Sequence, residues 1–291
     1  MERGPRRVTP HFIPKIMANA VSGQVAIRHG ILGTTFTTSS ACASSGHAIG
    51  MALLAIRSGE VDLVITGGSE SATTPLSVAG FASAKALSKR NDDPGAASRP
   101  FDRDRDGFVI GEGAGILIFE ELERARKRGA RIYAEVKGYG STDDAFHITA
   151  PKEDGSGPAR AFQLALRQGG VDPETVDYVN AHGTSTEYND AIETRAIKKC
   201  FGDHARKLAV SSTKSMIGHL LGGSSAVELV ATALSVHHGV LHPTRNYTTP
   251  DPECDLDYVP REAREARIRN ALSNSLGFGG HNVSICIGQP D

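Results

Sequence analysis

Residues 207–237 read KLAVSSTKSMIGHLLGGSSAVELVATALSVH, and this stretch decides the class of fold. A short apolar strand is predicted at Lys207–Val210, followed by a turn of small residues and a helix at Ser224–His237. The helix is apolar on nearly all sides, which is typical of a helix buried inside a protein. A strand that leads into a buried helix indicates a layered α/β protein.

A similar unit lies near the start of the chain. The β-rich segment Thr34–Thr38 precedes a second nearly apolar helix, predicted at Ser44–Arg57. Further strands are predicted at 61–66, 108–119, 132–139, 176–180, 271–274 and 283–287, and further helices at 120–128, 158–168 and 190–200. This alternation predicts βαβ units and a largely parallel sheet. We therefore expect an α/β fold of two similar halves, residues 1–130 and 131–291.

The composition excludes several classes of protein. The 291 residues include 32 Lys+Arg and 33 Asp+Glu, whereas a dedicated nucleic-acid-binding protein is normally clearly basic. No apolar stretch approaches the ~18 residues of a membrane span, and no signal peptide is visible, so we expect no membrane association. The 4 cysteines are widely and irregularly spaced, which argues against a disulfide framework or zinc site and favours a cytoplasmic location.

The first candidate for chemistry is Cys42, in the segment TTSSACASSG at residues 37–46. A thiol at the start of a helix faces unpaired N–H groups and the positive end of the helix dipole. We expect these groups to lower the thiol pKa below the free value of ~8.5 and to hold an oxyanion. The alternative is a buried structural cysteine. The other three cysteines lack this setting and are interpreted as structural.

Two further motifs also follow predicted strands. YVNAHGTST contains His182, and SSTKSMIGH contains Lys214 and His219. Ligands bind at the carboxyl ends of strands in α/β sheets, where a histidine can act as acid, base or hydrogen-bond donor. The alternatives are a core histidine bonded to backbone, and a surface lysine beside a capping histidine.

A glycine-rich turn, NSLGFGGHN at residues 274–282, lies between the last two predicted strands. Such a turn lets backbone N–H groups approach a ligand closely. Three other histidines, His237, His238 and His242, have no nearby carboxylate or thiol, so no metal site is predicted.

The chain resembles the β-ketoacyl-acyl-carrier-protein synthases of the thiolase superfamily in these motifs, in their order along the chain, and in DLDYVP at 255–260. The resemblance covers essentially the whole chain. The HGTST form is similar to the type II elongating branch, whereas the type III branch has Asn at the role of His219. The resemblance implies a layered α-β-α-β-α arrangement in which the N-terminal half is incomplete.

The resemblance also implies an activity. The chain would be an acyltransferase whose substrates are carried on the phosphopantetheine of acyl carrier protein (ACP), with no other cofactor and no metal. Condensation of malonyl-ACP with an enzyme-bound acyl chain would elongate fatty acids, in a cytoplasmic homodimer. Two alternatives stay open: a ketosynthase of a polyketide or specialised lipid pathway, and a non-catalytic truncated homologue.

Individual roles follow from the same resemblance. The residues implied in catalysis are Cys42, His182, His219, Lys214 and Phe278. Those implied in binding the substrate are Thr184, Thr186, Gly277 and Gly279. Glu228 would support Lys214, and Lys85 would contact the acidic carrier protein.

Overall fold

The computed structural model describes residue 4 and residues 7–290, and the chain divides into two compact units, Met1–Ser39 and Ser40–Asp291. The first unit contains helices α1 (Phe12–Ile16) and α2 (Ala20–His29). The strand predicted at Thr34–Thr38 is wrong, because this segment is irregular. Residues with β-propensity form a strand only where a neighbouring strand packs beside them. The predicted division into halves at residue 130 stays a prediction.

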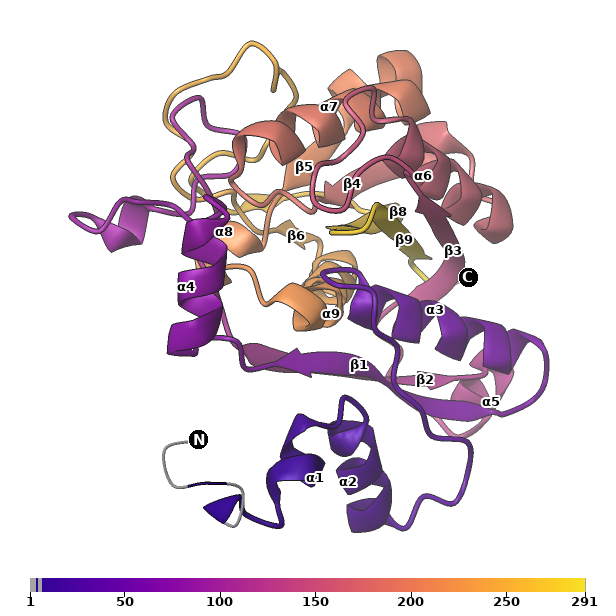
Figure 1. Cartoon of the computed structure of the whole chain (residues 1–291). Coiled ribbons are helices and arrows are strands. Elements are labelled where there is room, and N and C mark those ends of the chain that lie inside the picture. The colour runs from indigo at the N-terminus through magenta and orange to yellow at the C-terminus, as the bar shows by residue number, and fades with distance from the viewer. Residues whose placement is uncertain (1–3, 5–6, 291) are drawn as a thin grey trace. The chain divides into compact units, whose positions relative to one another are not determined.

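The second unit is built on a sheet of five strands in the order β3-β9-β8-β4-β5 (Figure 1). Their bounds are Glu135–Asp143 for β3, Val176–Asn180 for β4, Ala209–Ser211 for β5, Asn270–Gly277 for β8 and His281–Gly288 for β9. Strands β3, β8, β4 and β5 run in the same direction, and β9 runs antiparallel between β3 and β8. The predicted largely parallel sheet is therefore confirmed for the direction of four strands and wrong for β9. The short turn between β8 and β9 leaves no room for the crossover that parallel strands require.

A second, smaller sheet pairs β1 (Leu63–Glu70) with β2 (Gly113–Glu120) in antiparallel register. The short strands β6 (Val240–Leu241) and β7 (Arg264–Glu265) form a third pair.

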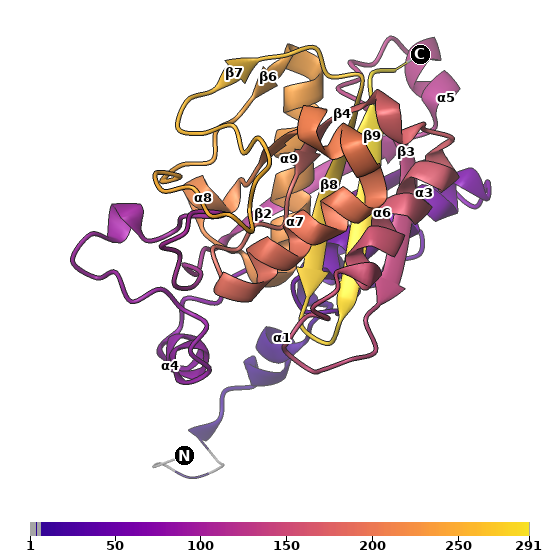
Figure 2. The same cartoon turned by 90° about the horizontal axis from the view of Figure 1, so that it is seen from above.

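Helices separate and cover these sheets. Between the β1–β2 pair and the five-stranded sheet lie α3 (Ser44–Arg57) and α9 (Ser224–His238), as Figure 1 shows. The other face of the large sheet is covered by α6 (Ser156–Gly169) and α7 (Glu187–Phe201), which lie over it in Figure 2. The apolar core accordingly fills both faces of the five-stranded sheet. These alternating layers confirm the predicted α/β architecture.

The two apolar helices are both largely buried, as predicted. Each leaves apolar side chains exposed on one side: Met51 and Leu54 in α3, and Leu234 in α9. Three short helices complete the unit: α4 (Pro75–Ser83), α5 (Leu122–Lys127) and α8 (Lys214–Ile217). No helix in the described part of the chain is long and apolar enough to cross a bilayer.

Candidate active site

The site is assembled from segments that follow strands or precede buried helices. Cys42 lies immediately before α3, and His182 follows β4. Lys214 begins α8 just after β5, and His219 lies between α8 and α9. The turn between β8 and β9, with Phe278 at its start, completes the set.

The backbone around Cys42 is sharply bent. Ala41 has φ +50°, a left-handed conformation that is unfavourable for a residue with a side chain. A Cβ atom added at Gly277 would lie 2.9 Å from the Ser40 carbonyl oxygen and 3.3 Å from the Cys42 nitrogen. Glycine at this position therefore lets the β8–β9 turn lie directly against the backbone of Cys42.

His219 is hydrogen-bonded to the thiol. Its Nε2 lies 3.2 Å from Cys42 Sγ, and its Nδ1 accepts a hydrogen bond of 3.2 Å from the Leu221 N–H. Because a backbone N–H can only donate, Nδ1 carries no proton, and the neutral ring holds its proton on Nε2. His219 thus presents an N–H group to the sulfur and to any oxygen placed beside it.

His182 is oriented by a buried ion pair. Its Nδ1 is 3.2 Å from Lys214 Nζ, which is also 2.5 Å from Glu228 Oε1. The ammonium group donates to Nδ1, so the proton of this ring is also on Nε2. The rings of His182 and His219 are 5.3 Å apart, centre to centre, and nearly perpendicular. Two neutral imidazole N–H donors therefore belong to one site.

Burial is the main influence on the pKa values of the two histidines and of Glu228. It lowers the pKa of both His182 and His219 well below the usual value, and the positive charge of Lys214 lowers them further. Both rings are therefore neutral at physiological pH. Burial also raises the pKa of Glu228, an effect that Lys214 opposes.

The expected lowering of the Cys42 pKa is wrong. Burial raises the pKa of this thiol to about 11, although Lys214 and the backbone N–H groups of Phe278 and Cys42 act in the opposite direction. The loss of solvation at a thiol that is only 8% exposed outweighs these favourable interactions. These two N–H groups are directed at the sulfur, and their use in holding an oxyanion stays a prediction.

This raised pKa predicts how Cys42 reacts with iodoacetamide. Below its pKa a thiol gains thiolate about tenfold per pH unit, so alkylation should accelerate steadily from about pH 8 to about pH 10. Peptide mass spectrometry at a series of pH values would measure the rate at Cys42 alone. A plateau reached below about pH 8 would contradict the prediction, because it would require a thiol acidified as the sequence suggested.

The remaining predicted residues occupy distinct positions. The hydroxyl oxygens of Thr184 and Thr186 are 2.9 Å apart in the turn after His182. Gly279 has φ +90°, and its N–H donates to the Ile148 carbonyl oxygen at 2.7 Å. Lys85 is exposed in the segment after α4, and its contact with a carrier protein stays a prediction.

Sequence reasoning missed Glu193 on α7. Both of its carboxylate oxygens accept backbone hydrogen bonds of 2.8 Å, one from His182 and one from Gly183. Burial raises the pKa of Glu193 to about 7. The available signal was its position on the same helix face as the apolar residues Ala196 and Ile197, where an acidic side chain needs a buried partner.

No group of three or more potential metal ligands occurs among residues 4 and 7–290. The polar groups around Cys42 instead bind one another.

Comparisons with known proteins agree in both sequence and fold. Residues 1–125 match the family model described as the beta-ketoacyl synthase N-terminal domain, and residues 133–248 match the C-terminal domain. The chain is 57% identical over 285 residues to 3-oxoacyl-[acyl-carrier-protein] synthase 2 of Synechocystis sp., covering 98% of this chain and 68% of that protein. A protein of the same name from Staphylococcus aureus is 52% identical, with 98% and 70% covered.

Solved structures give the same picture. A ketosynthase described as bound to the hexaketide, in complex with a type II PKS acyl-carrier protein, superposes with a TM-score of 0.97 at 40% identity, covering 99% of this chain and 71% of that one. A beta-ketoacyl synthase from Burkholderia phymatum gives 0.92 at 40% identity, covering 98% and 68%. The chain thus spans about 70% of the length of these relatives.

Proposed function

This chain belongs to the β-ketoacyl synthase family, and from that premise we propose that it condenses malonyl-ACP with an acyl group bound to Cys42. The product is 3-oxoacyl-ACP, and the reaction elongates fatty acids. The chain is an acyltransferase with a thiolase-like fold. The observation that carries the proposal is the 3.2 Å contact between Cys42 Sγ and His219 Nε2, with the ring of His182 beside it.

The first step transfers the acyl chain. The Cys42 sulfur attacks the thioester carbonyl of acyl-ACP, the bond to the pantetheine sulfur breaks, and the thiol proton leaves with that sulfur. The backbone N–H groups of Cys42 and Phe278, which are directed at the sulfur, stabilise the tetrahedral oxyanion. Because the proton leaves with the departing thiol, His219 need not become charged.

The second step generates the carbon nucleophile. Decarboxylation of malonyl-ACP places negative charge on its thioester oxygen, which accepts hydrogen bonds from Nε2 of His182 and of His219. The resulting enolate carbon attacks the acyl carbonyl, and the bond to Cys42 breaks. A proton from solvent then restores the thiol.

The surrounding residues prepare this chemistry. Lys214 fixes the proton of His182 on Nε2, and Glu228 balances the positive charge of Lys214. Thr184 and Thr186 offer hydroxyl groups to the pantetheine arm, and Lys85 a positive charge to ACP. We also propose that the protein forms a homodimer and is located in the cytoplasm.

Fatty-acid elongation is favoured over the other candidate functions. The relatives at 52–57% identity are named 3-oxoacyl-ACP synthases, whereas the compared ketosynthase of a polyketide system is 40% identical. An inert homologue is disfavoured because the thiol, both histidines and the Lys214–Glu228 pair are all in contact.

Purified protein incubated with an acyl-ACP should gain the mass of one acyl group, located at Cys42 by peptide mass spectrometry. Addition of malonyl-ACP should then remove this group and release one CO2 for each 3-oxoacyl-ACP formed. Protein alkylated beforehand with iodoacetamide is the control and should gain no acyl group. Absence of both the adduct and CO2 from the untreated protein would refute the proposed function.

A further inference from the structure

The polar segment 99–107, RPFDRDRDG, contacts the turn that carries Thr184 and Thr186. Phe101 lies beneath this turn, since a Cβ atom added at Gly183 would meet its ring at 3.2 Å. The backbone N–H of Phe101 also donates to Asp190 on α7, at 2.8 Å. Segment 99–107 therefore supports the residues that directly follow His182.

The centre of the turn is Ser185, which has φ +68° and is fully buried. A left-handed residue with a side chain is unfavourable and persists only where its surroundings hold it in place. Here its Oγ accepts a hydrogen bond from the Arg99 N–H, and its carbonyl oxygen accepts one from the Gly107 N–H, both at 2.9 Å. The two ends of segment 99–107 thus fix the backbone between the two threonines.

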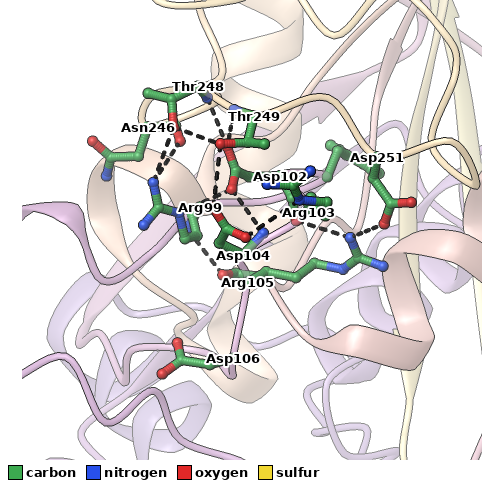
Figure 3. A network of polar contacts seen from close by, with 12 residues as sticks. Arg99, Asp102, Arg103, Asp104, Arg105, Asp106, Asn246, Thr248, Thr249 and Asp251 are labelled. Atoms are coloured by element: carbon green, nitrogen blue, oxygen red, sulfur yellow. Dashed lines mark hydrogen bonds and ion pairs between the residues drawn. The ribbon is translucent and has the colours of Figure 1, made fainter.

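Arg105 makes further contacts to this turn. Its Nε donates to the Thr186 carbonyl oxygen at 3.0 Å, and its Nη2 donates to the Glu187 carbonyl oxygen at 2.8 Å. On its other side, Nη1 donates to Asp251 at 2.5 Å. Figure 3 shows the guanidinium group reaching Asp251 beside the network formed by Asp102 and Thr249.

The position of Arg105 is electrostatically unusual. Thr186 and Glu187 begin α7, and a cation at the start of a helix opposes the helix dipole. Asp190, at 3.8 Å, and Asp251 compensate for its charge. Stability of α7 alone would not select a buried arginine here, whereas precise placement of the preceding turn requires several donors held in one plane.

We infer that Arg105 is a positioning residue: it holds the turn 184–187 so that the hydroxyl groups of Thr184 and Thr186 meet the pantetheine arm of the substrate. This inference rests on the proposed function of the site. Lysine is the informative replacement, because it keeps the charge but its donors leave from one nitrogen. The guanidinium group instead spreads donors from three nitrogens over the Thr186 and Glu187 carbonyl oxygens and Asp251.

The test compares Arg105→Lys with Arg103→Lys, a matched control two residues earlier whose side chain is exposed and pairs with Asp104. Steady-state condensation with malonyl-ACP gives KM and kcat, and iodoacetamide alkylation of Cys42 reports on the nucleophile without a pantetheine arm. For Arg105→Lys we expect the KM for malonyl-ACP to rise about 10- to 100-fold. Alkylation should stay within about twofold of wild type, and the control should match wild type throughout.

A second variant, Ser185→Ala, removes only the bond from the Arg99 N–H and should raise KM in the same direction by a smaller factor. It decides the question if Arg105→Lys does not fold. An unchanged KM in the folded variants, or an equal loss of alkylation and of condensation, would overturn the inference. Wild-type protein that forms neither adduct nor product would instead refute the proposed function, and the inference with it.

Discussion

Cys42→Ser is expected to abolish the acyl-enzyme and to lower the rate of condensation by at least about 10³-fold. A serine hydroxyl reacts only when a neighbouring base removes its proton. His219 cannot be that base as it is held here, because its Nδ1 accepts from the Leu221 N–H and its proton is therefore on Nε2. Intact-protein mass spectrometry with acyl-ACP, together with the rate of 3-oxoacyl-ACP formation, would measure both effects.

Cys200→Ser is the matched control for this substitution. Burial also raises the pKa of Cys200, to about 12, but this thiol lies at the end of α7 rather than beside the two histidines. Its replacement should change the condensation rate by less than about twofold, as is usual away from a reacting group. If Cys42→Ser retained more than a tenth of the wild-type rate, Cys42 would not be the nucleophile.

The sequence predicted that His182 and Lys214 lie together, because segments that follow neighbouring parallel strands leave the sheet at the same edge. Strands β4 and β5 are parallel neighbours with Asn180 opposite Ser211. The segments that follow them, with His182 and Lys214, must therefore leave the sheet at the same edge. Helices bounded by clear composition changes were predicted equally well, and Ser44–Arg57 has the bounds that the structure gives to α3.

Other features depend on surroundings that a local pattern does not contain. The pKa of Cys42 reflects burial by several distant segments, so the favourable helix terminus alone gave the wrong direction. Glu193 bonds to the backbone of His182, a contact made without any motif around the acid itself. The strand predicted at Thr34–Thr38 failed for the same reason, since a β-strand requires a partner.

Lys214→Met is expected to reduce both stability and activity. It leaves Glu228 buried without its cation, and breaking such a pair from one side costs about 3–5 kcal/mol. It also removes the donor that fixes the proton of His182 on Nε2, so we expect condensation to slow by about 10- to 100-fold. Urea unfolding would measure the first effect, and the rate of 3-oxoacyl-ACP formation the second.

The double variant Lys214→Met/Glu228→Leu separates these two effects. Replacing both members of a buried pair by apolar residues is often nearly neutral for stability, so the free energy of unfolding should largely recover. Condensation should remain slow, because His182 still lacks its donor. The partly exposed pair of Lys198 and Asp255 provides the control, since Lys198→Met should cost no more than about 1 kcal/mol. If the double variant regained wild-type activity along with its stability, the role of Lys214 would be to balance the charge of Glu228 and not to orient His182.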